Sequence, residues 1–185
     1  MKILLAITGA SGVIYGKRTL EVLSKKKDVQ VDLIVSESAK KLIKMELDTS
    51  YKDIVSMARE SFDQNEIEAS PASGSSLYDI MLIVPCSLST LSKISSGIAD
   101  NLITRSAAVL LKEGRKIVLV PRETPLSTVY LENMRRLSSQ GCIILPAMPG
   151  FYSKPKNIDD LIDFIVGKIL DNIGIKNDLY KRWCV

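Results

Sequence analysis

The sequence contains no histidine among its 185 residues, and this absence excludes several kinds of enzyme at once. Without an imidazole there is no Ser-His-Asp or Cys-His catalysis, no histidine acid/base group and no zinc site that uses histidine. Cysteines are also few, because only Cys86, Cys142 and Cys184 are present, far apart and in no CxxC pair. This number and spacing indicate reduced thiols in a cytoplasmic protein, rather than a disulfide framework or a metal site.

Excess charge, aromatic residues and long apolar runs are scarce as well. The chain has 25 Lys and Arg against 21 Asp and Glu, a net charge of +4, and 5% aromatic residues that are not interleaved with the basic ones. Nucleic-acid binding is therefore not expected. The apolar run 3–7 is too short for a signal peptide, and no segment approaches the ~18 apolar residues of a membrane span. With 46% hydrophobic residues, the chain has enough apolar side chains for one soluble, cytoplasmic domain over residues 1–185.

Short apolar runs rich in β-branched residues alternate with segments of helical character. The runs are 3–7, 29–35, 80–84, 117–120 and 142–145, and the helical segments are 14–26, 39–47, 88–96, 102–112, 125–139 and 157–173. This alternation predicts an α/β fold with a mainly parallel sheet that is covered on both faces. Residues 52–69 are acidic and weakly periodic, and 70–76 (SPASGSS) reads as a loop, so neither is assigned an element.

Prolines stand at the ends of three predicted strands. Pro85, Pro121 and Pro146 each follow an apolar run, where the missing N–H is expected to stop the strand ladder. In an open parallel sheet, ligands bind beyond the carboxyl ends of the strands. We therefore expect the polar residues after Gly9, Ser36 and these three prolines to converge on one site.

Three turns after strands carry groups suited to anions. Gly9-Ala10-Ser11-Gly12 precedes a helix, so its backbone N–H groups could approach a phosphate, although a purely structural tight turn remains the alternative. Ser36 closes the second run, where its own residue type favours a cap or turn role over ligand contact, and Ser38 is placed to cap the next helix. Residues 87–90 (SLST) offer three hydroxyls at a helix start, which suit phosphate oxygens or the polar edge of a flavin.

Charged residues mark two further places. Arg122 and Glu123 follow a buried strand, with Lys112 upstream, and this position favours an anion clamp beside a proton-transfer carboxylate over an exposed surface pair. The sequence 159–163 (DDLID) matches the D-D-x-x-D pattern of magnesium-binding prenyltransferases. However, Asn157 precedes it as a good N-cap, so we interpret these acids as the first turns of a helix and expect no metal.

Seven segments together resemble the UbiX-type flavin prenyltransferases, a branch of the flavoprotein superfamily that also contains cysteine decarboxylases. The segments are TGASGVIYG (8–16), PASGSS (71–76), PCSLSTLSKISSG (85–97), DNLITRSAAVLLKEGRK (100–116), VPRETPLS (120–127), LPAMPGFYSKP (145–155) and DLYKRW (178–183). The resemblance implies a three-layer Rossmann-like, flavodoxin-type fold and a homododecamer with active sites between subunits. It also implies a metal-independent reaction that joins dimethylallyl monophosphate to N5 and C6 of reduced FMN. The product, prenylated FMN, serves a partner decarboxylase of the UbiD type.

The resemblance also assigns roles to individual residues. The positions that match FMN contacts are Gly9, Ala10, Ser11, Ser36, Ser87, Leu88, Ser89, Thr90 and Arg122. Those that match the binding of the prenyl phosphate are Tyr152 and Lys168. Other active-site positions fall on Lys112, Arg122, Glu123, Glu46 and Trp183, of which Glu46 and Trp183 are expected near a subunit boundary. Glu123 with Ser11 is the candidate relay for the proton lost from C6, and the cations would stabilise the leaving phosphate.

The chain departs from the family pattern at two positions. Lys168 stands where arginine is common, so a point charge replaces a bidentate group, and Ala108 replaces an aspartate. Two alternative functions stay open at this point: an FMN-dependent cysteine decarboxylase and a non-catalytic FMN-binding protein. The missing histidine argues against the decarboxylase, and the joint presence of Lys112, Glu123, Tyr152 and Lys168 argues against the binding protein.

Overall fold

A computed structural model of the chain describes residues 1–183, so Cys184 lies outside the described part. The strands are β1 (Lys2–Ile7), β2 (Gln30–Val35), β3 (Glu60–Asp63), β4 (Ile80–Cys86), β5 (Lys116–Pro121) and β6 (Ile143–Ile144). The helices are α1 (Val13–Ser24), α2 (Glu37–Glu46), α3 (Tyr51–Ser56), α4 (Leu88–Ser95), α5 (Leu102–Lys112), α6 (Thr128–Ser139) and α7 (Ile158–Asn172). None of the helices within residues 1–183 is long and apolar enough to cross a bilayer.

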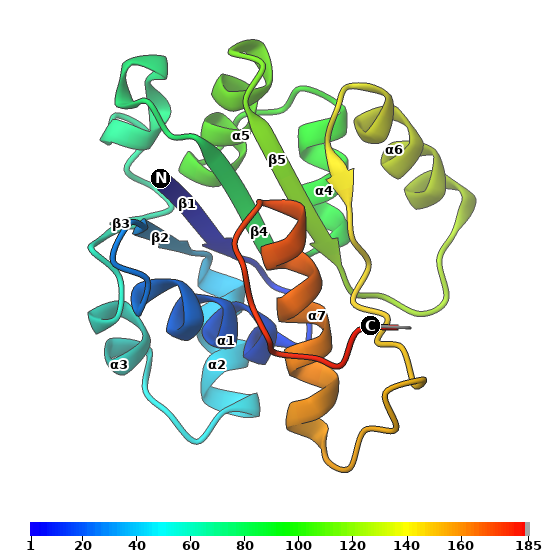
Figure 1. The fold of residues 1–185 in the computed structure, drawn as a ribbon. Coiled ribbons are helices and arrows are strands. Elements are labelled where there is room, and N and C mark those ends of the chain that lie inside the picture. The colour runs from blue at the N-terminus through cyan, green and yellow to red at the C-terminus, as the bar shows by residue number, and fades with distance from the viewer. Residues whose placement is uncertain (184–185) are drawn as a thin grey trace.

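The strands form one parallel sheet in the order β3-β2-β1-β4-β5-β6 (Figure 1). The strand order reverses between β1 and β4, and in such sheets this is the place where a crevice opens beyond the carboxyl ends. The three-layer α/β fold predicted from the sequence is confirmed.

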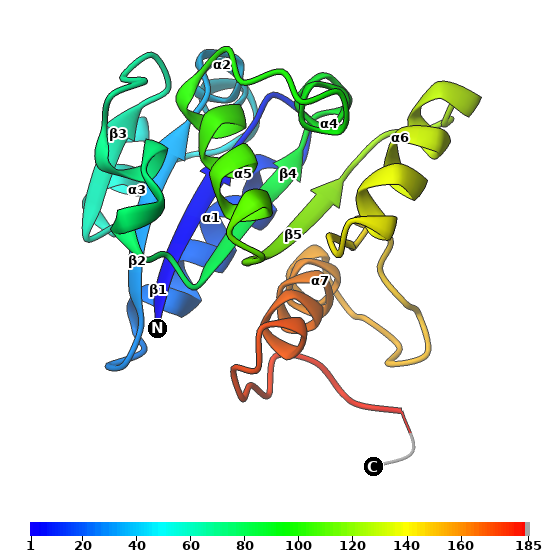
Figure 2. The same ribbon diagram turned by 90° about the horizontal axis from the view of Figure 1, so that it is seen from above.

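Both faces of the sheet are buried under helices, which explains why the strands read as continuous apolar runs. Ile3, Leu5 and Ile7 of β1 pack in the cluster that contains α1, α2, α3 and α7, whereas Leu4 and Ala6 pack in the cluster that contains α4, α5 and α6. Seen from above, α1 and α5 lie on opposite sides of β1 and β4 (Figure 2). The carboxyl ends of the strands are therefore left as the open edge of the core.

The region 52–69, to which the sequence analysis assigned no element, contains most of α3 and all of β3. Ser50 and Asp53 form a capping box at the start of α3, of which only Ile54 is fully buried. Strand β3 has the sequence ESFD and pairs with β2 alone, at the edge of the sheet. An edge strand needs few apolar residues, so its composition carried no strand signal.

One of the prolines does not stop its strand as expected. Pro85 lies inside β4, whereas β5 ends at Pro121. Proline lacks a donor but keeps its carbonyl, and the Pro85 carbonyl accepts from the N and the Oγ1 of Thr8 at 3.2 and 2.8 Å. The ladder therefore continues past Pro85, with a register shift between Ile83 and Cys86.

Candidate active site

A cavity of about 450 Å³ opens beyond the carboxyl ends of β1, β2, β4 and β5. It is lined by Gly9, Ser36, Ser38, Gln64, Ser87, Leu88, Ser89, Thr90, Lys93, Asn101, Ile103, Glu123 and Tyr130. The expected convergence therefore holds for the turns that follow four strands. The fifth expected segment, after Pro146, contributes no residue to the lining.

The start of α4 supplies three of the hydroxyls in this cavity, those of Ser87, Ser89 and Thr90. Ser87 is the N-cap, and its Oγ accepts from the N of Thr90 at 3.2 Å and contacts the Thr90 Oγ1 at 2.9 Å. The buried Thr8 holds the turn in place, because its Oγ1 accepts from the N of Ser87 at 2.7 Å. Hydroxyls and backbone N–H groups at a helix start form a neutral donor set that fits a phosphate.

The turn at residues 9–12, before α1, does not leave all of its backbone N–H groups free for a phosphate, as the sequence led us to expect. Glu46 Oε2 accepts from the N of Gly12 at 2.8 Å and from the N of Val13 at 3.3 Å. The chain's own carboxylate thus occupies the position that a phosphate would take at this helix start. Gly9 is needed for close packing, since a Cβ there would lie 2.4 Å from the Cβ of Ser38.

Ser36, rather than Ser38, caps α2. The Ser36 Oγ accepts from the N of Ala39 at 3.1 Å, while Ser38 lies within the first turn of α2 beside Gly9. The helix begins at Glu37, two residues earlier than the predicted helical segment 39–47. Both hydroxyl residues line the cavity, and Ser36 serves as a cap at the same time.

Arg122 and Glu123 do not form an ion pair with each other within the described residues. The Arg122 Nε donates to the backbone carbonyl of Ser11 at 2.9 Å, which joins the turn after β5 to the turn after β1. Burial raises the pKa of Tyr15, and the positive charge of Arg122 opposes this rise. Glu123 is exposed at the cavity and accepts from the N of Thr124 at 3.1 Å. A carboxylate and a guanidinium therefore stand side by side in sequence with separate partners.

Comparison with known proteins decides the family. The model of the Flavoprotein family matches residues 1–170. The flavin prenyltransferase UbiX of Methanocaldococcus jannaschii is 50% identical over 183 residues, covering 99% of this chain and 98% of that protein. This chain belongs to the UbiX flavin prenyltransferase family.

Two solved structures of UbiX-like proteins superimpose on nearly the whole chain. A dodecameric FMN-dependent UbiX-like decarboxylase from Escherichia coli O157:H7 has a TM-score of 0.97 and 42% identity, covering 99% of both chains. AnUbiX in complex with FMN and dimethylallyl pyrophosphate has a TM-score of 0.94 and 40% identity, covering 98% of this chain and 96% of that one. The fold is therefore that of UbiX proteins.

Three residues expected from the UbiX resemblance gather around the C-terminal end of the chain. The rings of Tyr152 and Trp183 lie edge to face, with centroids 5.2 Å apart, and Trp183 is still 68% exposed. Lys168 is exposed on α7, with its Nζ 5.8 Å from the centroid of the Tyr180 ring. The N of Ala147 donates to the carbonyl of Pro121 at 3.0 Å, which ties the start of the loop carrying Tyr152 to the end of β5.

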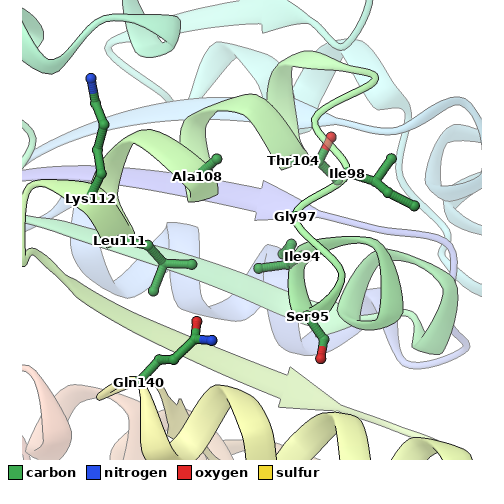
Figure 3. A pocket seen from close by; sticks show the side chains of 9 residues that line it. All are labelled: Ile94, Ser95, Gly97, Ile98, Thr104, Ala108, Leu111, Lys112 and Gln140. Carbon is green, nitrogen blue, oxygen red and sulfur yellow. The ribbon is translucent and has the colours of Figure 1, made fainter.

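Lys112 lies elsewhere in the chain, in a second cavity of about 400 Å³ between α4, α5 and α6. Figure 3 shows its side chain extending from the end of α5, at the opposite end of this cavity from Ile98 and Thr104. The Lys112 Nζ lies 3.7 Å from Glu113 and lines no part of the cavity that contains Glu123. Ala108, the position where the family often has aspartate, lines the same second cavity as Lys112.

Sequence analysis missed five residues of the first cavity: Gln64, Lys93, Asn101, Ile103 and Tyr130. Gln64 follows β3, so it could not be placed while that strand was unrecognised. The position of Asn101 at the start of a helix could have been predicted from the sequence, because it is the N-cap of α5 and Thr104 completes a capping box with it. The Lys93 Nζ lies 2.6 Å from Asp100, and nothing in the spacing of these two residues indicated that they would line a site.

Proposed function

We propose that the protein transfers a dimethylallyl group from dimethylallyl monophosphate to N5 and C6 of reduced FMN and so makes prenylated FMN. The observation that carries this proposal is the near full-length match to UbiX flavin prenyltransferases, in a chain whose cavity combines phosphate-binding hydroxyls with a carboxylate. A decarboxylase of the UbiD type is the proposed user of the product.

The first cavity fits FMN in the character of its donors. The start of α4 provides the hydroxyls and N–H groups for the phosphate, and Ser36 adds another hydroxyl from the turn after β2. Gly9, Ala10 and Ser11 form the floor of the crevice next to Arg122 in this proposal. Arg122 is held by the Ser11 carbonyl, which leaves the other guanidinium nitrogens for a ligand.

The flavin supplies the electron-rich nucleophile, so the protein needs no nucleophile of its own. In the proposed reaction, Glu123 removes the proton from C6, with the Ser11 hydroxyl as the relay to the leaving phosphate. Lys112, Arg122 and Lys168 stabilise the charge that develops on that phosphate, and Tyr152 donates a hydrogen bond to it. Cations of the chain take this role, and the proposed reaction needs no metal ion.

The proposed assembly is a dodecamer with active sites shared between subunits. The dodecameric UbiX-like relative supports it, and so does the position of Lys112 far from the Glu123 cavity of the same chain. We place the protein in the cytoplasm. Cys86 and Cys142 are buried free thiols, which suits a reducing compartment.

The test is an anaerobic incubation of the protein with FMN, a reductant and the prenyl donor, followed by mass measurement of the released flavin. We expect the flavin to gain the mass of a dimethylallyl group. Parallel reactions with the monophosphate and the pyrophosphate decide the donor, since the AnUbiX complex contains the pyrophosphate. An unchanged flavin mass with both donors, for protein shown to be folded and flavin-loaded, would rule out the proposed function.

A further inference from the structure

The chain after α7 folds back along that helix and is held by one carboxylate, Asp171. Its Oδ2 accepts from the hydroxyl of Tyr180 at 2.6 Å, and its Oδ1 accepts from the Nδ2 of Asn177 at 2.9 Å. Arg182 approaches both oxygens, with Nη2 2.7 Å from Oδ1 and Nη1 3.0 Å from Oδ2. These donors hold the pKa of Asp171 down, at about 2. Three residues of the C-terminal segment 174–183 thus converge on a single side chain of α7.

The surface of α7 is shaped to receive this segment. Gly167 lies under the ring of Tyr180, and a Cβ at Gly167 would be 2.4 Å from that ring. The Tyr180 ring packs edge to face against Phe164 at 5.0 Å, and Phe164 packs against Tyr152 at 5.9 Å. The last ring of this row is Trp183, which lies against Tyr152. The segment therefore brings its two aromatic residues to the two positions, Tyr152 and Lys168, that the proposed function assigns to the prenyl donor.

We infer that Asp171 is a positioning residue for prenyl-donor binding: it holds the C-terminal segment so that Trp183 lies beside Tyr152 and Tyr180 lies beside Lys168. This inference rests on the proposed function, in which Tyr152 and Lys168 bind the prenyl phosphate. The row of rings offers an apolar wall to a dimethylallyl chain, while Lys168 offers a charge to its phosphate. Asp171 itself has its oxygens occupied by chain donors, so it acts through the segment and not on the substrate.

A purely structural role makes a different prediction. If Asp171 only stabilised the fold, its loss would lower the melting temperature and affect FMN and donor binding alike. A positioning role affects the donor alone, because the residues proposed to bind FMN lie in the turns after β1, β2 and β5 and at the start of α4, and not on α7. The comparison of donor KM with FMN affinity separates the two roles.

The experiment compares Asp171→Asn with the matched control Asp178→Asn in the full chain. Asp178 lies in the same segment, is exposed, and makes no ion pair or side-chain hydrogen bond within residues 1–183. Trp183 is the only tryptophan, so the anisotropy of its emission reports whether the segment is docked. For Asp171→Asn we expect lower anisotropy and a donor KM raised about tenfold, with kcat and FMN affinity within about twofold. Asp178→Asn should match the wild type.

A second variant keeps the result decisive if Asp171→Asn does not fold. Arg182→Gln removes the same ion pair from the exposed partner and should give the same lower anisotropy and higher donor KM. If the wild type forms the adduct and the donor KM is unchanged in both variants, the inference about Asp171 is wrong, although the proposed function stands. A wild type that forms no adduct would overturn the proposed function, and unchanged anisotropy in both variants would show that Asp171 does not hold the segment.

Discussion

Glu123 is the only carboxylate among the described residues that line the cavity beyond β4 and β5. Its one side-chain hydrogen bond there is from the N of the next residue, Thr124, and no cation within residues 1–183 forms an ion pair with it. A carboxylate that faces a substrate cavity and forms no ion pair is suited to accept a proton. This makes Glu123 the residue with which to test the proton-transfer step.

We predict that Glu123→Gln binds FMN with unchanged affinity and forms the adduct about a hundredfold more slowly, because an amide cannot accept the proton. Flavin fluorescence titration measures the affinity, and anaerobic single-turnover absorbance measures the rate. Glu132→Gln is the control, since Glu132 pairs with Arg135 on α6 and lines no part of the cavity. Equal rates in the wild type and Glu123→Gln would remove this residue from the mechanism.

Asp171 and Tyr180 set the pH range over which the C-terminal segment stays docked. The donors around Asp171 lower its pKa from about 3.9 in an unfolded chain to about 2, so its contribution is complete above pH ~4 and is lost as the pH falls toward 2. Burial and the Asp171 charge raise the pKa of Tyr180 to about 12. The contribution of Tyr180 is therefore complete below pH ~10 and is lost as the pH rises toward 12.

We predict that the fluorescence anisotropy of Trp183 is constant between pH 5 and 9. Asp171 stays ionised and Tyr180 stays protonated throughout this range. No histidine is present to titrate within that range. The measurement is a pH series on the folded protein, with circular dichroism at each point to confirm that the fold is intact. A transition in anisotropy with a midpoint inside the range would show that some other group controls docking.

At the scale of elements, the contact between α1 and β4 holds the glycine turn in place. Gly16 lies on the buried side of α1, and a Cβ there would be 2.3 Å from the carbonyl oxygen of Val84 and 2.9 Å from Ile7. Both neighbours belong to buried strands that cannot yield without disturbing the sheet. The start of α1, which carries the Glu46 contact, depends on this close packing.

We predict that Gly16→Ala lowers the free energy of unfolding by about 2 kcal/mol, because overpacking against backbone outweighs the helix propensity gained from alanine. In a thermal melt this corresponds to a Tm about 6 °C lower. Gly74→Ala is the matched control, since its Cβ would meet only the flexible end of the Glu113 side chain, at 2.8 Å. If both variants melted like the wild type, the helix would have room to move away from β4.

The elements that could be predicted are those with strong periodicity or clear caps. The helix predicted over residues 102–112 has the bounds that the structure shows, and the stretch is amphipathic with Asn101 as its N-cap. Strand β3 was missed because an edge strand needs no apolar run. Pro85 lies inside β4 rather than after it, because its carbonyl is enough to extend the ladder although proline has no N–H to donate.

The site was predictable where residues follow buried strands and unpredictable where they depend on tertiary contacts. Gly9, Ser36, Ser87 and Glu123 meet because parallel strands end at the same edge. The contact of Glu46 with the start of α1 joins residues 34 positions apart, and no local pattern indicates it. The position of Trp183 likewise depends on a fold-back of the chain that only Asp171 and its partners specify.

For the molecule as a whole, the separation of Lys112 from Glu123 is the main argument for shared sites. Lys112 is the last residue of α5, whereas Asn101, just before that helix, lines the Glu123 cavity. A helix of this length spans about 16 Å, which is beyond the reach of a lysine side chain. If both residues act on one substrate, they must come from different subunits.

Subunit complementation tests this directly. We predict that Lys112→Ala and Glu123→Gln are each nearly inactive alone and that co-expression of the two restores about a quarter of the wild-type rate, the fraction of sites that receive both native residues by random assembly. Two different affinity tags, purified in series, isolate the mixed oligomers. The control pairs Lys112→Ala with a chain carrying both substitutions, because that mixture contains no native Lys112 and should stay inactive. If the mixed oligomers are no more active than the average of the two single variants, Lys112 and Glu123 belong to the site of the same subunit. A stable monomer with full activity, seen by light scattering, would rule out shared sites altogether.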